Sequence, residues 1–163
     1  MTEKAALLAQ RLIRNVEQVE MKHDRRPPLY DSVGARLGTG TAADKLGASF
    51  DCVAPGPYHF HYAQEEMFII LEGSGTLRVA GEMLPIVSGD VIFIPPGPEY
   101  PHQIINTSDA PLKYLSVSTR EQPELVMYPD SGKYQAMARS ADGEQVRYLQ
   151  RPSTSLDYWQ DEP

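Results

Sequence analysis

Two stretches of sequence decide how this chain is interpreted. Gly56–Gly73 reads GPYHFHYAQEEMFIILEG, and Gly89–Asn106 reads GDVIFIPPGPEYPHQIIN. The chain has 4 histidines, and three of them, His59, His61 and His102, lie in these stretches. Their apolar runs are short and are bounded by glycines and prolines, which predicts strands and turns rather than helices.

The histidines have a spacing that suits a metal ion. His59 and His61 are one residue apart, so a strand would place both imidazoles on the same face, where they can reach one ion. A carboxylate follows at Glu65 or Glu66, and His102 would come from a distant strand. The sequence therefore predicts a divalent metal held by three nitrogens and one oxygen. About two positions of an octahedral ion would stay open for water, dioxygen or a bidentate substrate.

The rest of the chain is predicted to be mostly β-structure. Leu8, Leu12, Val16 and Val19 recur at spacings of three and four, which predicts one helix over Ala5–Met21 with Thr2 as its N-cap. Short apolar runs separated by Gly and Pro turns suggest a sandwich or barrel. The expected strands are Leu46–Ala54, Met67–Leu71, Thr76–Ala80, Leu84–Val87, Val91–Ile94, His102–Ile105, Leu112–Ser118 and Leu125–Tyr128.

The overall composition fits one globular domain. The chain has 163 residues, a net charge of -7 and a single cysteine. The length is typical of one domain, and one cysteine allows no internal disulfide. The acidic balance argues against nucleic acid or an anionic membrane as a partner. No signal peptide or membrane-spanning run is visible in the sequence, so we expect a cytoplasmic protein.

The two histidine stretches resemble the two motifs of the cupin superfamily. The first family motif is G, five residues, H-x-H, three or four residues, E, six residues, G. His59, His61, Glu66 and Gly73 match it, although Val53 stands where the first glycine is expected. The spacing to Gly73 favours Glu66 over Glu65 as the carboxylate.

The second family motif is G, five residues, P-x-G, two residues, H, three residues, N. In this chain Gly89, Pro95, Gly97, His102 and Asn106 match it, but four residues rather than two separate Gly97 from His102. A strict count would put Tyr100 at the histidine position. His102 is favoured because imidazole suits these metals better and because its spacing to Asn106 is kept.

The resemblance implies an all-β fold with one cupin barrel, a double-stranded β-helix or jelly roll. The barrel would cover residues 46–119, with a helix and arm at 1–45 and an extension at 120–163. The ligands would be His59, His61, Glu66 and His102, and the metal Fe, Mn, Ni, Co or Zn. The chain is most similar to small bacterial cupins labelled sugar-phosphate-isomerase-like. Small cupins commonly form dimers, so a homodimer is expected.

The resemblance leaves several functions open. The first is a metalloenzyme that isomerises a small polar substrate such as a sugar or sugar phosphate. It would need a base, for which Glu65, Tyr62 and Tyr100 are candidates. The alternatives are an Fe(II)-dependent dioxygenase, a lyase acting on a small organic acid, and a sugar-binding protein without turnover. A phosphorylated substrate would also need cations facing the pocket, and the candidates are Arg36, Lys45, Arg78 and Lys113.

Overall fold

The computed structural model describes residues 1–26, 30–52, 56–153 and 155–162. Within them it has one helix and thirteen strands in three antiparallel sheets, as the sequence predicted for an all-β fold. Their orders are β1-β2-β3-β10-β5-β8, β13-β12-β11-β4 and β7-β6-β9. The elements are α1 (Glu3–Leu12), β1 (Lys22–Arg26), β2 (Tyr30–Arg36), β3 (Leu46–Cys52), β4 (Phe60–His61), β5 (Glu66–Glu72), β6 (Ser74–Val79), β7 (Glu82–Val87), β8 (Val91–Ile94), β9 (His102–Ile105), β10 (Lys113–Thr119), β11 (Glu124–Tyr128), β12 (Lys133–Arg139) and β13 (Gln145–Gln150).

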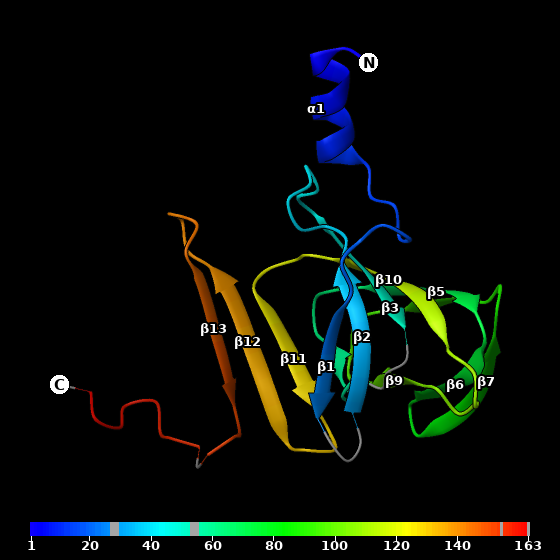
Figure 1. Ribbon diagram of the computed structural model, residues 1–163. Coiled ribbons are helices and arrows are strands. Elements are labelled where there is room, and N and C mark those ends of the chain that lie inside the picture. Colours follow the sequence, from blue (N-terminus) through cyan, green and yellow to red (C-terminus); the bar gives the residue numbers. More distant parts are fainter. Residues whose placement is uncertain (27–29, 53–55, 154, 163) are drawn as a thin grey trace.

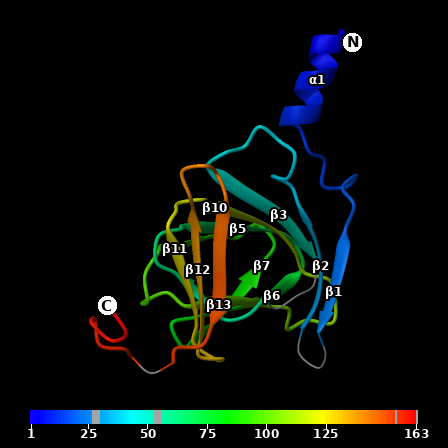
Figure 2. The ribbon, with the colours of Figure 1, turned by 90° about the vertical axis from the view of Figure 1, so that its left-hand side faces the viewer.

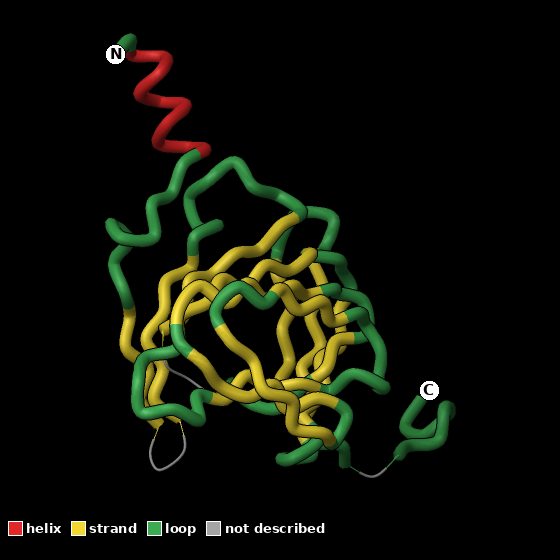
Figure 3. The backbone as a smooth tube through the Cα atoms, turned by 90° about the vertical axis from the view of Figure 1, so that its right-hand side faces the viewer, coloured by secondary structure: helices red, strands yellow, loops and turns green. Residues whose placement is uncertain are grey.

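The strands curve around a common axis and form a barrel, which is seen end-on in Figure 3. The three-stranded sheet lies to one side of it, and β11–β13 lie to the other (Figure 1). Helix α1 stands away from the barrel, and the chain after β13 runs outward from the opposite side (Figure 2).

The core of the barrel follows from strand alternation. On β5, Phe68 and Ile70 are buried, and Glu66 lies on the same face because side chains two residues apart point the same way. The hydrophobic core is a cluster of buried apolar side chains: Phe68, Ile70, Leu77, Ile86, Ile94, Ile104, Leu112 and Tyr114. The face of β5 that builds the core thus also carries the candidate carboxylate ligand.

The predicted helix over Ala5–Met21 is wrong in extent. Thr2 is the N-cap, as expected, and its hydroxyl accepts a hydrogen bond from the Ala5 amide at 3.2 Å. The helix ends at Leu12, however, and Asn15 starts a turn by accepting hydrogen bonds from Glu17 and Gln18. An asparagine competes with helix in this way. None of the helix residues is buried, so tertiary packing does not stabilise a longer helix.

The chain after the last motif is part of the barrel wall. Strand β11 pairs with β4, so that Val126 lies opposite His61 and Met127 opposite Phe60. Strands β12 and β13 extend the same sheet, and neither was expected from sequence.

Two further expected features lie partly outside the described residues, namely the end of the strand Leu46–Ala54 and the first-motif position Val53. Among the residues described, no helix is long and apolar enough to cross a membrane.

Candidate metal centre

Three imidazoles converge on one carboxylate inside the barrel. The distance from the Glu66 Oε2 atom is 2.8 Å to His102 Nε2, 3.4 Å to His61 Nε2 and 3.7 Å to His59 Nε2. The candidate ligand atoms of His59, His61 and Glu66 all lie within 4.8 Å of one another. Ligand atoms at 2.0–2.2 Å from one ion lie roughly 3 Å or slightly more from each other, so this spacing suits a shared ion.

The backbone brings these residues together from separate strands. His59 and His102 form an isolated antiparallel bridge, with amide-to-carbonyl distances of 3.1 and 2.8 Å. The His61 carbonyl accepts a hydrogen bond from the Gly97 amide at 2.8 Å, which ties the loop of the second motif to the first. Residues more than forty positions apart in the sequence are therefore fixed beside each other by main-chain pairing.

Each imidazole has its Nδ1 atom close to an acceptor. His59 Nδ1 lies 2.8 Å from the Pro57 carbonyl, His102 Nδ1 lies 3.1 Å from the Tyr100 carbonyl, and His61 Nδ1 lies 3.8 Å from Glu124 Oε2. An acceptor at Nδ1 favours the tautomer that leaves the Nε2 lone pair free for a metal. The partners of the first two rings are backbone groups and the third is a buried carboxylate.

Glu124 is a residue of the site that the sequence did not reveal. Its side chain is fully buried and accepts backbone hydrogen bonds from Tyr62, Ala63 and Gln64, at 3.0, 3.4 and 2.7 Å. These bonds hold the turn after His61 against β11. A glutamate in a polar stretch after a proline carries no local signal of burial, and only the pairing of β4 with β11 places it there.

The electrostatics favour neutral imidazole at His59 and an ionised Glu66. Burial, helped by the neighbouring His102, lowers the pKa of His59 to about 4. For Glu66, burial alone would raise the pKa, but His102 and His61 outweigh it and lower the pKa below the ordinary carboxyl value. Burial also opposes protonation of His61, yet the carboxylates of Glu66 and Glu124 raise its pKa.

The residues present fit a divalent metal. Four buried side-chain atoms in the described chain lack a hydrogen-bond partner, namely both ring nitrogens of His61, Nε2 of His102 and Oε2 of Glu66. His61 Nδ1 lies toward Glu124, whereas the Nε2 atoms of His61 and His102 both face Glu66 Oε2. Buried polar atoms are almost always paired, so these three facing atoms indicate a missing common partner. Imidazole nitrogen with one carboxylate oxygen is a donor set that first-row metals prefer. His59, His61, Glu66 and His102 would hold the ion.

The three candidate bases lie apart from these atoms. Tyr62 and Tyr100 have exposed fractions of 50% and 43%. Tyr62 directly follows His61, so its side chain points the opposite way. It lines an apolar groove formed with β11, β12 and β13. Glu65 is exposed, and its amide donates to the Thr119 hydroxyl. Among the described residues, no hydrogen bond or ion pair joins these three side chains to the ligand group.

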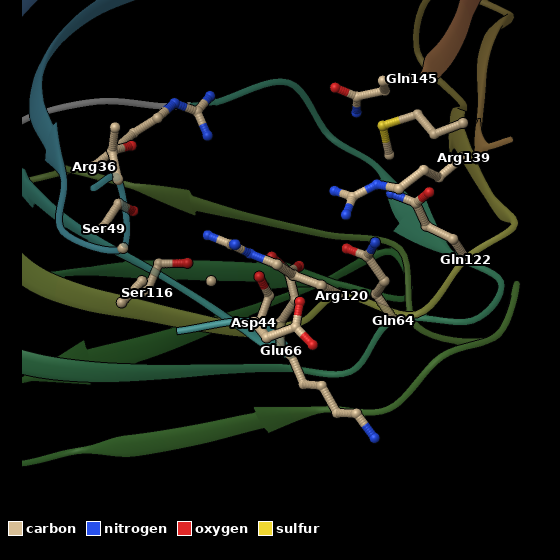
Figure 4. A pocket seen from close by; sticks show the side chains of 17 residues that line it. Arg36, Asp44, Ser49, Gln64, Glu66, Ser116, Arg120, Gln122, Arg139 and Gln145 are labelled. Carbon is tan, nitrogen blue, oxygen red and sulfur yellow. The ribbon is translucent and has the colours of Figure 1, made fainter. Parts of the chain in front are cut away.

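A polar cavity of about 830 Å³ opens beside Glu66 (Figure 4). Arg36 and Lys45, two of the predicted cations, line it together with Arg120 and Arg139, which the sequence did not single out. The other lining residues are Gly38, Thr39, Asp44, Gly47, Ala48, Ser49, Gln64, Glu66, Ser116, Ser118, Gln122, Met137 and Gln145. The cavity is of a size that holds a small-molecule ligand.

The other two predicted cations lie elsewhere. Arg78 forms two hydrogen bonds to the Asp130 carboxylate, at 2.6 and 2.9 Å, and its guanidinium lies 3.8 Å from the centre of the Tyr58 ring. Lys113 lies 2.6 Å from Glu72 on the adjacent strand. Neither of them lines the cavity.

Comparison with known proteins agrees with the fold. Residues 51–118 match the family model described as the cupin domain. An uncharacterised protein of Methanocaldococcus jannaschii is 43% identical over 60 residues, which are 37% of this chain and 46% of that protein. The match thus spans less than half of the relative's length.

Several solved structures share the fold. A Silicibacter pomeroyi protein named sugar phosphate isomerase, from a cupin superfamily, is 24% identical over 86% of this chain and 96% of its own, with a TM-score of 0.68. An Acidithiobacillus ferrooxidans protein, provisionally named a sugar phosphate isomerase, is 23% identical over 85% and 92%, with a TM-score of 0.71. The polyketide cyclase RemF of Streptomyces resistomycificus is 26% identical over 68% and 80%, with a TM-score of 0.58.

Proposed function

We propose that this chain is a metal-dependent enzyme with a cupin barrel, on the premise that residues 51–118 match the family model of the cupin domain. Its substrate would be a small polar molecule, and its reaction an isomerisation of the sugar or sugar phosphate type. One observation carries the proposal: the unpaired, buried ligand atoms of His61, Glu66 and His102 converge beside a polar cavity. The names of the two similar structures from S. pomeroyi and A. ferrooxidans favour this reaction over the alternatives.

The separate roles of the metal and of the protein side chains follow from the chemistry of isomerisation. A bound divalent metal would polarise adjacent oxygens of the substrate. The protein must then take a proton from one carbon and return it to the neighbouring carbon, with no net oxidation. A group that does this must lie on the inner wall of the barrel, within reach of the bound substrate.

Asp51 is the carboxylate that we propose for this proton transfer. It lies two residues from Ser49 on β3, so the two side chains share one face of the strand. Ser49 lines the cavity beside Glu66, and Asp51 lines a second pocket of about 550 Å³ that shares Arg36, Thr39 and Ser49 with it. The Ser49 hydroxyl donates to Asp51 Oδ2 at 2.5 Å. Burial raises the pKa of Asp51, which brings a carboxylate closer to the range where a general base works well. Opposite it, burial and the charges of Asp51 and Glu66 raise the pKa of Tyr114, so that phenol stays protonated.

Metal analysis of the purified protein tests the proposal. We expect about one equivalent of a first-row metal in the wild type by mass spectrometry, and its loss in His61→Ala and in His102→Ala. The matched control is His23→Ala, because His23 is exposed on β1 and pairs with Asp31 outside the site. Wild-type protein that stays metal-free after reconstitution would contradict the proposal and favour a binding protein without turnover.

Activity assays separate the reaction classes. The metal-loaded protein is incubated with aldoses, ketoses and their phosphates in D2O, and exchange at the carbon next to the carbonyl is followed by NMR. Such exchange is expected for an isomerase, with loss in Asp51→Asn. Oxygen consumption that depends on Fe(II), without exchange, would instead identify a dioxygenase.

A further inference from the structure

Cationic side chains gather at the cavity of an otherwise acidic protein. The chain has a net charge of -7, but Arg36, Lys45, Arg120 and Arg139 all line this one cavity. Among the described residues that line it, Asp44 is the only acid apart from the candidate metal ligand Glu66. The local charge is therefore opposite to that of the whole molecule, and the cavity walls concentrate its field.

Within the part of the chain that the structure describes, these four cations form no ion pair. The ion pairs of arginine and lysine in the described chain involve Arg25, Arg26, Arg78 and Lys113, none of which lines the cavity. Asp44 and Glu66 offset part of this charge, and Arg36 also interacts electrostatically with Asp51, but the cations that remain in excess repel one another. Grouping them in one recess is thus unfavourable for the free protein unless an anion joins them.

The arginines come from different parts of the chain and face a common space. Arg36 ends β2, Arg139 ends β12 and Arg120 follows β10. In Figure 4 the guanidinium groups of Arg36 and Arg139 point toward one another from opposite walls, with Arg120 between them. A planar guanidinium suits the two oxygens of a phosphate or carboxylate, and several can hold the same group.

Two glycines make room for Arg120. A side chain at Gly38 would place its Cβ 2.8 Å from Arg120 Nη2, and one at Gly47 would place its Cβ 3.5 Å from Arg120 Nε. A larger residue at Gly38 would therefore crowd the guanidinium, whereas one at Gly47 would be in ordinary contact with Arg120 and would crowd the Ser118 hydroxyl, at 2.8 Å. Ser116 and Ser118, whose hydroxyls have no hydrogen-bond partner in the described chain, line the cavity nearby.

We propose that this recess, built by Arg36, Arg120, Arg139 and Lys45, binds the anionic end of the substrate, a phosphate or carboxylate on a polyhydroxylated carbon chain. This inference rests on the proposed function, because Glu66 places the candidate metal beside the same cavity. The anionic end binds at the arginines and the oxygen-bearing end reaches the histidines. The recess thus selects charged over neutral sugars and fixes which end of the molecule is activated.

Isothermal titration calorimetry tests the recess with four probes: inorganic phosphate, glucose 6-phosphate, gluconate and glucose. We expect at least one of the two anionic sugar derivatives to bind and glucose to bind far more weakly. Arg36→Gln and Arg139→Gln should each weaken anion binding about tenfold or more. Arg25→Gln, an exposed arginine on β1 outside the cavity, is the matched control and should leave binding unchanged.

The pattern of binding identifies the anion. Binding of phosphate and glucose 6-phosphate without gluconate indicates an organic phosphate, and the reverse indicates a sugar acid. Binding should also weaken as salt is added, because screening acts on these charges. Equal affinity for glucose and both anions, or no effect of the arginine substitutions, would overturn the inference.

His102→Ala separates this inference from the proposed function. Phosphate binding that persists in this metal-deficient variant shows that the recess acts without the metal. A wild type that holds metal but binds none of the anionic probes would overturn the recess and leave the metalloenzyme standing. A wild type without metal that still binds phosphate through Arg36 and Arg139 would support the recess and overturn the metalloenzyme proposal.

Discussion

At the scale of single residues, Glu124 connects the metal centre to the last part of the chain. Its carboxylate lies 3.8 Å from His61 Nδ1 and accepts three backbone hydrogen bonds. A carboxylate behind a histidine ligand orients the ring and makes it a stronger donor. Its role is therefore distinct from that of Glu66, which faces the imidazoles directly.

We predict that Glu124→Gln weakens metal affinity by about 10- to 100-fold. The glutamine keeps the shape of the side chain but removes the charge and turns one acceptor into a donor facing backbone amides. The measurement is a titration against a competing chelator, with circular dichroism to verify folding. Glu121→Gln, at an exposed position on the same segment, is the control. Unchanged affinity in folded Glu124→Gln would show that Glu124 does not orient His61.

Asp51 allows a pH-dependent prediction at the same scale. Its pKa is raised mainly by burial, so the folded state holds the proton more tightly than the unfolded state. The stability from this group is present below the ordinary carboxyl pKa and is lost as pH rises through the raised value. Asp51→Asn, which can still accept from Ser49, should therefore gain stability over the wild type as the pH rises above the ordinary carboxyl range.

Urea denaturation at several pH values measures this gain, and Asp109→Asn, at an exposed position, serves as control. The same Asp51→Asn variant should lose proton exchange of the substrate. A more stable but inactive protein is the signature of a buried charge kept for function. A stability difference that does not change with pH would refute the assignment.

At the scale of elements, Gly73 shows why the first motif ends in glycine. Its φ is +86°, and a Cβ there would collide with the carbonyl oxygen of Pro111. Gly73 connects β5 to β6 and lies against the residue before the buried Leu112. The turn therefore needs both the left-handed backbone and the missing side chain.

We predict that Gly73→Ala destabilises the protein by about 2–4 kcal/mol. Gly81→Ala is a close control, since its φ is +84° but nothing lies within 4 Å of the added Cβ. That variant should cost only the backbone strain, about 1 kcal/mol. Thermal or urea unfolding compares the two, and equal losses would contradict the role given to the contact with Pro111.

At the scale of the whole molecule, the N-terminal helix is joined to the loop at Ala42 by a hydrogen bond to the Arg11 carbonyl, at 3.0 Å, while its apolar side chains stay exposed. No residue of α1 is buried, and Leu7, Leu8, Leu12 and Ile13 have exposed fractions of 56, 46, 62 and 66%. A ten-residue helix is only marginally stable alone in water. An apolar surface of this kind is typical of one that is covered in an assembly.

We therefore predict that the protein is a homodimer in which α1 is covered. Sedimentation velocity at micromolar concentration should give the dimer mass, and removal of residues 1–13 should shift the protein toward monomer. Substituting Lys4 by Ala, on the same helix but outside the apolar residues, is the control. A monomeric wild type would contradict the prediction. The expected cytoplasmic location stays a separate prediction, which cell fractionation tests.

The sequence predicted the parts of this protein that depend on local spacing. One residue between His59 and His61 puts both rings on one face of a strand. The resemblance to the cupin motif, with six residues between Glu66 and Gly73, selected Glu66, which shares a face of β5 with the buried Phe68, and Gly73, which stands at the turn. The strands Val91–Ile94 and His102–Ile105 have the predicted bounds. Apolar runs interrupted by glycine and proline are sufficient to define such elements.

The tertiary structure alone decided what depends on which distant segments meet. Pairing of β4 with β11 buries Glu124 behind His61, and the meeting of β2, β12 and the end of β10 gathers Arg36, Arg139 and Arg120 at one cavity. Asp51 likewise reaches the interior only because β3 pairs with β10. A charged residue looks the same in sequence whether it faces solvent or a cavity, because its environment is set by long-range strand pairing rather than by its neighbours along the chain.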